Sequence, residues 1–262
     1  IYFLVENLNQ IISAFKPISL TEMDSVKLMD RTDTKFVFHL QDLEAILSQI
    51  SGHYRALEVE GTRWSPYETL YFDTETLELY LRHHNQKMNR FKIRYRTYVN
   101  SNLHFFEIKF KNNKGRTIKK RIKEQGIETE IKDKAQQLLE TITDFKANQL
   151  KPILYVNCSR ATLVNTEMGE RLTLDVKLQF KKGDKEINYE PLVIAELKQN
   201  KVNVQSPFYR LMKQKRFRSS SMSKYCFGVT QIFSKIKMNN FKPKILTISK
   251  ILNAPTTSFN RS

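Results

Sequence analysis

The chain has 262 residues, of which 40% are hydrophobic, and it carries a formal net charge of +17. That length and composition suffice for one large domain, or two small ones, with a packed core. The charge predicts a polyanionic partner, which could be nucleic acid, an acidic membrane surface or a phosphorylated small molecule. Only seven glycines are present, and neither GxGxxG nor GxxxxGK[ST] occurs, which excludes the familiar Gly-rich nucleotide loops.

The N-terminal stretch and the two cysteines bear on the compartment. Residues 1–15 are fairly apolar, but Glu6 and two asparagines interrupt them and no basic segment precedes them. The stretch therefore resembles neither a signal peptide nor a spanning helix. Cys158 and Cys226 are far apart and form no zinc pattern, which predicts buried free thiols in a reduced compartment. We expect a soluble, cytoplasmic protein without a transmembrane segment.

Hydrophobic spacing distinguishes strands, which alternate with period two, from helices, which repeat apolar residues every three to four positions. In chain order the pattern predicts a strand over residues 31–39, a helix over 40–50, strands over 90–99, 103–111 and 118–122, a helix over 135–145, strands over 171–176 and 195–198, and a weaker helix over 206–214. Ser206-Pro207 is a start signal for the last helix. His83 and His84 fall in an expected hairpin loop over residues 82–89, where they would be solvated.

The polar faces of the predicted strands are dominated by Lys and Arg. The most basic face, in the strand over residues 90–99, holds Arg90, Lys92, Arg94 and Arg96. A sheet with one wet face alternates in the same way, so a purely structural role is one interpretation. However, such a face ordinarily mixes Thr, Ser, Gln, Glu and Lys. Four like charges in a row destabilise a strand unless an anion lies among them.

The position of the aromatic residues helps to separate phosphates from nucleic acid. Single-strand binders place aromatic side chains beside the cations so that bases can stack. Here the strand aromatics lie mostly on the opposite face, which favours bare phosphates, although Trp64 and Tyr67 from expected loops are available for stacking. Nucleic acid is therefore the less favoured alternative for the polyanionic partner.

Seven motifs, in order along the chain, resemble the VTC domain, the polyphosphate polymerase branch of the triphosphate tunnel metalloenzymes. They are Arg31–Phe36, Tyr71–Thr74, Lys92–Arg96, Phe106–Lys109, Arg171–Asp175, Ala195–Lys198 and Ser223–Tyr225. The similarity covers residues 20–233, between an N-terminal segment of residues 1–19 and a tail of residues 234–262 that we expect to be partly ordered. The resemblance implies an α+β fold, a closed eight-stranded antiparallel β tunnel (the triphosphate tunnel fold) with flanking helices and with cations inside.

For function, the resemblance implies an enzyme that cleaves ATP and extends polyphosphate, with ATP, polyphosphate and pyrophosphate as its partners. Carried over by position, the catalytic cations would be Lys35, Arg94, Arg96, Lys109, Lys198 and Lys224, and further phosphate-binding residues would be Arg31, Lys119, Arg121, Arg160 and Arg171. Glu196, together with Glu107, would hold Mn²⁺ or Mg²⁺. A structural alternative for Glu196 is a salt bridge to Lys198 or to another cation of the tunnel.

The sequence also departs from the pattern of this superfamily. Many tunnel hydrolases begin with ExExK, whereas the matching positions here are Arg31, Asp33 and Lys35, so fewer carboxylates are available for metal or water. The alternatives are a tunnel hydrolase acting on tripolyphosphate or nucleoside triphosphate, a non-catalytic polyphosphate-binding module, and a single-stranded RNA binder. The chain shows neither the SPX domain nor the membrane helices of the fungal complexes, so the resemblance does not by itself extend to inositol-phosphate control or direct membrane export. A membrane-protein partner and the oligomeric state stay open.

Asp175 and a basic cluster near residue 215 also have expected roles. Asp175 is better placed to hold a neighbouring arginine than to act as a general base. A basic cluster near residue 215 is either a solvated helix end or a guide that attracts an anion towards a tunnel mouth. Its members are Lys213, Lys215, Arg216 and Arg218.

Overall fold

The computed structural model of the protein describes residues 2–24 and 31–253. Within this part of the chain, twelve strands form one sheet, namely β1 (Lys16–Ile18), β2 (Thr32–His39), β3 (Arg55–Leu57), β4 (Ser65–Thr74), β5 (Arg90–Tyr98), β6 (Leu103–Lys111), β7 (Thr117–Glu124), β8 (Leu150–Asn165), β9 (Glu170–Lys182), β10 (Lys185–Tyr189), β11 (Leu192–Gln199) and β12 (Ser219–Ser220). The helices are α1 (Tyr2–Ser13), α2 (Leu20–Met23), η1 (Leu40–Asp42), α3 (Leu43–Ile50), α4 (Glu78–His84), α5 (Asp133–Ile142), η2 (Ala147–Gln149), α6 (Pro207–Gln214), α7 (Lys224–Ile232), η3 (Asn239–Phe241) and α8 (Lys242–Leu252). None of these helices is long and apolar enough to cross a membrane.

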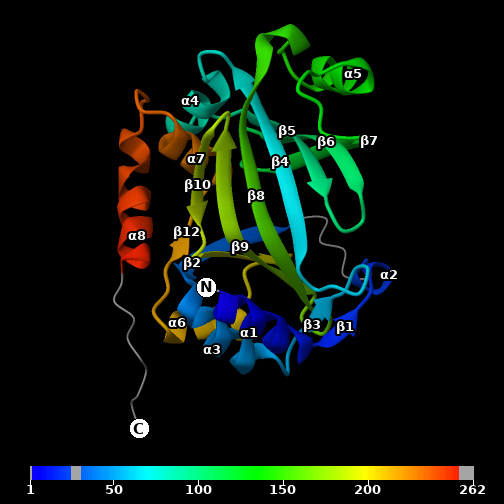
Figure 1. Cartoon of the computed structure of the whole chain (residues 1–262), viewed down its shortest axis with the longest axis vertical. Coiled ribbons are helices and arrows are strands. Elements are labelled where there is room, and N and C mark those ends of the chain that lie inside the picture. Colours follow the sequence, from blue (N-terminus) through cyan, green and yellow to red (C-terminus); the bar gives the residue numbers. More distant parts are fainter. Residues whose placement is uncertain (1, 25–30, 254–262) are drawn as a thin grey trace.

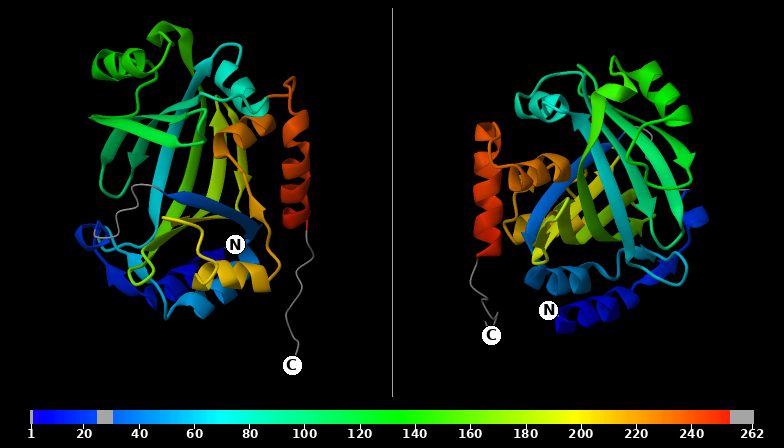
Figure 2. Two further views of the ribbon diagram at one scale, coloured as in Figure 1. Left: turned by 180° about the vertical axis from the view of Figure 1, so that it is seen from behind. Right: turned by 45° about the horizontal axis from the view of Figure 1, so that its top comes forward.

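The sheet is antiparallel along its main path, whose strand order is β12-β2-β11-β9-β8-β4-β5-β6-β7 (Figure 1). Strand β10 pairs with β9, and the parallel pair β1 and β3 joins the sheet through β8. The views in Figure 2 show that the sheet is strongly curved, with helices on its outside and at its ends. An antiparallel α+β architecture is therefore confirmed.

The expected closure of the tunnel is wrong, and the expected count of eight strands is not confirmed. The sheet has twelve strands, and within the described residues its path ends at β12 and β7 without pairing these two strands. Strand β12 is only two residues long, so it offers few hydrogen bonds for closure.

Strand register decides which side chains share the concave side of the sheet, which we call the inner face. Arg94 on β5 lies opposite both Glu107 on β6 and Tyr71 on β4. Because side chains alternate along each strand, every second residue from these positions shares the same face. The inner face therefore collects the cations that the sequence placed on polar strand faces, while the apolar residues between them point outward.

Two of the three large cores lie on the outer face. In the first, Phe36, Leu174 and Leu197 pack beneath α1, α3 and α6. In the third, Leu70, Ile93 and Phe106 pack beneath α5. Burial of these large apolar side chains supplies the main drive for folding.

The second core fills one end of the inner face, where α7 inserts. Phe227 and Val229 of α7 are buried among inner residues such as Tyr71, Val156 and Phe180. Gly228 permits this close approach, because a Cβ atom at that position would lie 2.5 Å from Cδ1 of Phe180. The apolar part of α7 thus occupies one end of the curved sheet, and its N-terminus points to the basic part.

The three helices predicted from the sequence are confirmed. The one over residues 40–50 consists of η1 followed by α3. The helix over residues 135–145 is α5, and that over 206–214 is α6, whose N-cap Ser206 accepts a hydrogen bond from the backbone N–H of Tyr209.

The hairpin loop expected for the two histidines is wrong, because both lie in the last turn of α4. The buried carboxylate of Asp73 accepts backbone hydrogen bonds from Leu79 and Tyr80, each at 2.8 Å, and so fixes the start of this helix. His84 is 1% exposed, and its Nε2 accepts a hydrogen bond from the N–H of Asn240. It is therefore a packed side chain and not a solvated one.

The two terminal segments both contribute to the cores. Leu8, Ile12 and Phe15 belong to the first core. Helix α8, which lies within the segment expected to be a partly ordered tail, places Ile248 in the second core. Residues 254–262 lie outside the described part of the chain.

A buried carboxylate connects several elements of the first core through hydrogen bonds, and no described cation lies within ion-pair distance of it. Glu170 is 1% exposed and accepts hydrogen bonds from Gln199 Nε2 at 2.6 Å, from Ser206 Oγ at 2.9 Å and from the hydroxyl of Tyr54. These donors come from β11, from the N-cap of α6 and from the segment before β3. The network fixes three elements to the start of β9.

Replacing Tyr54 by Phe should lower the free energy of unfolding by about 2 kcal/mol, because a buried carboxylate loses one of its three donors. Urea unfolding measures this difference. Tyr155→Phe is the matched control, since the Tyr155 hydroxyl makes no hydrogen bond within the described residues, and it should change stability by much less. Equal effects of the two substitutions would contradict this role for Glu170.

Candidate functional site

Three carboxylates organise the cations of the inner face, and the first is Glu107 on β6. Its carboxylate is 1% exposed and contacts Arg94 through Nε at 2.8 Å and Nη2 at 2.7 Å. Lys119 from β7 forms a second ion pair with it. Although burial opposes ionisation, the charges of these cations hold the pKa of Glu107 well below its usual range. Glu107 is thus a fixed anion that positions cations from the two neighbouring strands.

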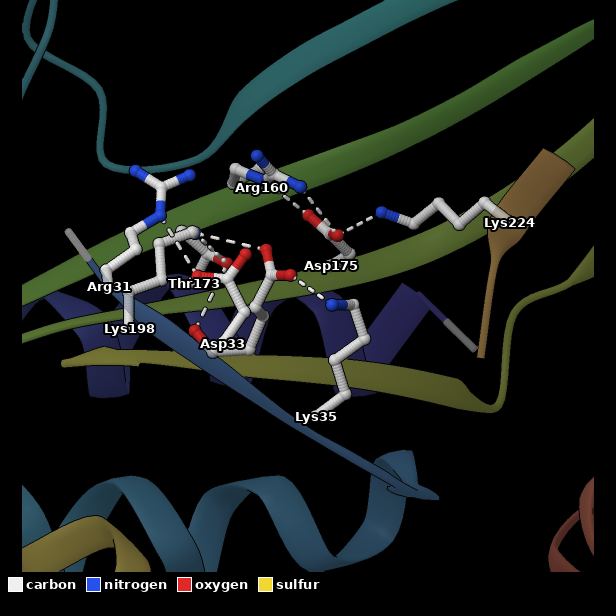
Figure 3. A network of polar contacts seen from close by, with 9 residues as sticks. Arg31, Asp33, Lys35, Arg160, Thr173, Asp175, Lys198 and Lys224 are labelled. Atoms are coloured by element: carbon white, nitrogen blue, oxygen red, sulfur yellow. Dashed lines mark hydrogen bonds and ion pairs between the residues drawn. The ribbon is translucent and has the colours of Figure 1, made fainter. Parts of the chain in front are cut away.

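The second carboxylate, Asp175 on β9, joins a strand to the N-terminus of α7. Arg160 from β8 makes a bidentate contact, with Nε at 2.5 Å and Nη2 at 2.8 Å from the two oxygens. Lys224, the first residue of α7, contacts the same carboxylate from the other side (Figure 3). The interpretation of Asp175 as a holder of an arginine is confirmed. Against the effect of burial, Arg160 and Lys224 lower the pKa of Asp175.

The third carboxylate, Glu196 on β11, holds two lysines. Lys198 Nζ lies 3.2 Å from Oε2, and Lys35 from β2 contacts Oε1. Lys198 also donates to the hydroxyl of Thr173 at 3.1 Å. The ion pair that the sequence offered as a structural alternative for Glu196 is therefore present. Burial opposes ionisation, but the two lysines keep the pKa of Glu196 well below its usual value.

The opposite walls of the curved sheet are close enough for their charges to interact. Burial lowers the pKa of Lys109 on β6 to about 8, and the charges of Lys92, Glu196 and Lys35 also act on it. Two of these groups, Glu196 and Lys35, belong to the other wall of the sheet. The inner face is therefore a single electrostatic unit that spans β2, β11, β5 and β6.

Other predicted cations lie at the margin of this unit or face different groups. Arg96 donates to Thr69 Oγ1 at 3.2 Å and lies over the ring of Tyr67. Arg121 lies over the ring of Phe105, with 4.4 Å between the guanidinium carbon and the ring centroid. The remaining two are turned towards local partners, Arg31 towards Asp33 at 3.0 Å and Arg171 towards the carbonyl oxygen of Met23 at 2.6 Å.

Aromatic residues do reach the inner face, and Tyr67 contacts two of its cations. Tyr67 belongs to β4 and not to a loop, and its ring lies under both Arg96 and Arg160, at 5.5 and 5.0 Å from the centroid. Trp64 precedes β4 and packs against the first core. Both arginines thus contact the ring of Tyr67 in a cation–π arrangement. A nucleic-acid base could stack on this ring only by displacing one of them.

Three inner residues were missed as site residues by sequence reasoning. Lys92 shares its strand face with Arg94 and Arg96, so the period-two pattern already indicated it. Tyr71 accepts a hydrogen bond from Arg94 Nη1 at 2.9 Å. Ser223, the N-cap of α7, accepts one from Lys92 at 2.9 Å. Only the three-dimensional position of α7 brings this serine to the inner face.

A divalent metal on the inner face would need carboxylate ligands. Across residues 2–24 and 31–253, no three His, Cys, Asp or Glu side chains lie together in a way that could hold a metal ion. Glu107 is covered by its cations, while Glu196 is the more accessible carboxylate, with a side chain 16% exposed. Mg²⁺ is commonly bound through one or two carboxylates together with substrate phosphates. Glu196 fits that mode, in which the substrate supplies most of the ligands.

The cysteines and the basic cluster of α6 add no reactive group to this face. Cys158 and Cys226 are buried and unpaired, as predicted. Lys213, in the last turn of α6, lies over the ring of Tyr209 at 5.7 Å. The other members of that cluster follow the same helix end, and both interpretations of the cluster stay open.

The pKa of Lys109 makes stability depend on pH. Its folded pKa is about 8, against an ordinary value of 10.5, so between these values the unfolded chain holds a proton that the folded chain has released. The free energy of unfolding therefore rises with pH in this window, and below pH 8 the penalty is fully present. Lys109→Met should stabilise the ligand-free protein at pH 7 and lose most of that advantage by pH 10. Urea unfolding at both values measures this, and an advantage independent of pH would contradict it.

Comparison with known proteins identifies the family. The VTC domain model matches residues 30–233. No curated protein matches the chain. Among solved structures, an adenylyl cyclase candidate from Hippeastrum, reported to have a dominant triphosphatase activity, is 15% identical with a TM-score of 0.49, over 79% of this chain and 98% of that one. A conserved hypothetical protein from Pyrococcus furiosus is 14% identical with a TM-score of 0.42, over 76% and 99% of the two chains. With more than half of its length matched by that family model, the chain belongs to the VTC domain family.

Proposed function

We propose that this protein is a polyphosphate polymerase that transfers the terminal phosphate of ATP to a growing polyphosphate chain in a metal-dependent reaction. A terminal oxygen of the acceptor attacks the γ-phosphorus of ATP, the bond from γ-phosphorus to the β,γ-bridging oxygen breaks, and ADP leaves. Membership of the VTC domain family supports a polyphosphate-related activity. The more specific proposal, an ATP-dependent polymerase, rests on the chemistry of the inner face.

The observation that carries the proposal is the surplus of fixed cations over carboxylates on that face. Each of the three carboxylates described above holds two basic side chains in place, so basic groups outnumber acidic ones in every such cluster. Phosphoryl transfer depends mainly on positioning and on neutralising phosphate charge. Cations that are already held in position provide both without reorganisation during the reaction.

The runner-up function is hydrolysis of tripolyphosphate or a nucleoside triphosphate on the same face. Hydrolysis benefits from a general base that activates water. Despite burial, neighbouring cations keep the pKa values of Glu107, Asp175 and Glu196 low, which makes these carboxylates weak bases. The arrangement therefore favours a phosphate oxygen over water as the acceptor.

Glu196 is the residue that would hold Mn²⁺ or Mg²⁺ in this proposal. When bound, the metal supplies neutralisation of the charge on phosphate oxygens. To bind it, Glu196 has to give up part of its contact with Lys35 or Lys198, and those lysines are then free to contact phosphate. The protein groups that orient the substrate remain Arg160, Lys224 and the other inner cations.

Incubation of the purified protein with ATP and Mn²⁺ tests the proposal directly. Long-chain polyphosphate on a gel is the expected product. Release of free phosphate alone would support the hydrolase, and tight polyphosphate binding without turnover would support a binding module. Preferential binding of single-stranded RNA over polyphosphate would contradict all three phosphate-based functions.

Arg96 and Arg94 should behave differently when each is replaced by Ala. Arg96 has no ion-pair partner among the described residues, so its loss should weaken tripolyphosphate binding by about 2 kcal/mol and lower stability less than loss of Arg94, since it gives up only its contacts with Thr69 and the Tyr67 ring. Arg94→Ala should also lower the free energy of unfolding by roughly 3 kcal/mol, because buried Glu107 loses a partner. Calorimetric titration and urea unfolding measure the two effects. Wild-type affinity in the Arg96 variant would remove this residue from the site.

Glu196→Gln separates binding from chemistry. The substitution is nearly isosteric and removes a negative charge, so metal-free affinity for polyphosphate should hold or rise. Turnover should fall by roughly a hundredfold or more, because the metal loses its protein ligand. Glu190→Gln, at an exposed position before β11, is the matched control and should keep wild-type turnover. Full metal-dependent activity in the Glu196 variant would return Glu196 to a purely ion-pairing role.

A further inference from the structure

Two lysines of the inner face, like Arg96, contact no carboxylate among the described residues. Lys92 on β5 and Lys109 on β6 lie directly opposite each other in the strand register. Among the described residues, no carboxylate lies within ion-pair distance of either ammonium group, whereas six other inner cations share Glu107, Asp175 and Glu196. Within the described part of the chain, neither ammonium group of this pair is therefore compensated by a direct ion pair.

Such an arrangement is unfavourable in the free protein. Like charges that face each other across neighbouring strands destabilise the pairing. Lys35 from β2 adds a further positive charge that acts on both lysines, while the charges of Glu196 and Asp33 offset part of the repulsion at Lys109. Both side chains are only partly exposed, so water screens this repulsion incompletely. An anion between them would remove the repulsion.

Ser223 completes a set of donors around this position. Its Oγ accepts a hydrogen bond from Lys92 Nζ at 2.9 Å and another from the backbone N–H of Cys226 at 3.3 Å. Both lone pairs of the hydroxyl are therefore used, and its proton remains available for an acceptor. The contact also directs the Lys92 ammonium group towards the N-terminus of α7, where Lys224 follows Ser223 in the sequence.

We propose that Lys92, Lys109 and the hydroxyl of Ser223 form a phosphate subsite of the inner face, with Lys92 as a binding residue that the family motifs did not assign. The inference rests on the proposed polyphosphate-handling function and adds a defined subsite to it. A phosphate group fits because its several oxygens accept hydrogen bonds from more than one donor, while its charge neutralises the lysine pair. Elsewhere on the inner face a phosphate has to compete with Glu107, Asp175 or Glu196 for the cations. At Lys92 and Lys109 no described carboxylate makes an ion pair, so this competition is absent.

The subsite predicts opposite changes in stability and in binding. Lys92→Met removes one of two repelling charges, so the ligand-free protein should keep or increase its melting temperature. The dissociation constant for tripolyphosphate, measured by calorimetry without metal, should rise about ten- to hundredfold, as expected for loss of a charge-assisted contact. Ser223→Ala should weaken binding in the same direction but by less, because the Lys92 charge remains.

Lys120→Met is the control for removal of one positive charge. Lys120 lies on β7 opposite Ile108, on the outer face and exposed, and its loss should change the tripolyphosphate dissociation constant less than about threefold. An unchanged dissociation constant in Lys92→Met, or a loss no greater than that of the control, would overturn the subsite. A lowered melting temperature in the ligand-free variant would assign Lys92 a structural role instead.

This test also separates the subsite from the polymerase proposal, because it measures binding without turnover. If the wild-type protein makes no polyphosphate but loses tripolyphosphate affinity on Lys92→Met, the subsite stands and the polymerase proposal falls. If polyphosphate is made at the wild-type rate and the Lys92→Met variant binds normally, the reverse holds.

Discussion

Each of three inner carboxylates contacts two cations, and this ratio of two to one leaves the concave side of the sheet positively charged. The carboxylates reduce repulsion enough for the strands to pair, but they do not neutralise the face. They also fix the directions of the cations, since Arg160 is bound bidentately and Lys198 is held by both Glu196 and Thr173. A polyanion that enters therefore meets cations that are already positioned.

Helix α7 links this charged region to the folded core. Its apolar side packs through Gly228 against Phe180, while Lys224 and Ser223 at its start contact Asp175 and Lys92. Tyr225 stacks on Tyr71 with 4.9 Å between ring centroids and donates a hydrogen bond to buried Asp73. The position of the N-terminus of α7 in the basic face is therefore set by packing that lies outside it.

The period-two pattern of the strands was enough to predict which side chains share a face, and the ordered motifs were enough to indicate the family. Alternation does not reveal which partner lies across a curved sheet, so the joint contact of Lys35 and Lys198 with Glu196 needed the structure. The open sheet could not be predicted because closure depends on how β7 and β12 meet, and not on either sequence alone. Helix α4 was missed because Asp73, six residues before Leu79, fixes its start through a buried contact that local propensity does not contain.

The central claim is that a phosphate chain binds on the inner face. A crystal structure of the protein with tripolyphosphate tests it most directly. The account predicts phosphate density between β5, β6 and β11, within hydrogen-bond distance of Arg96, Lys92 and Lys198. Density found only on the outside of the molecule, for example beside Lys213 at the end of α6, would contradict it.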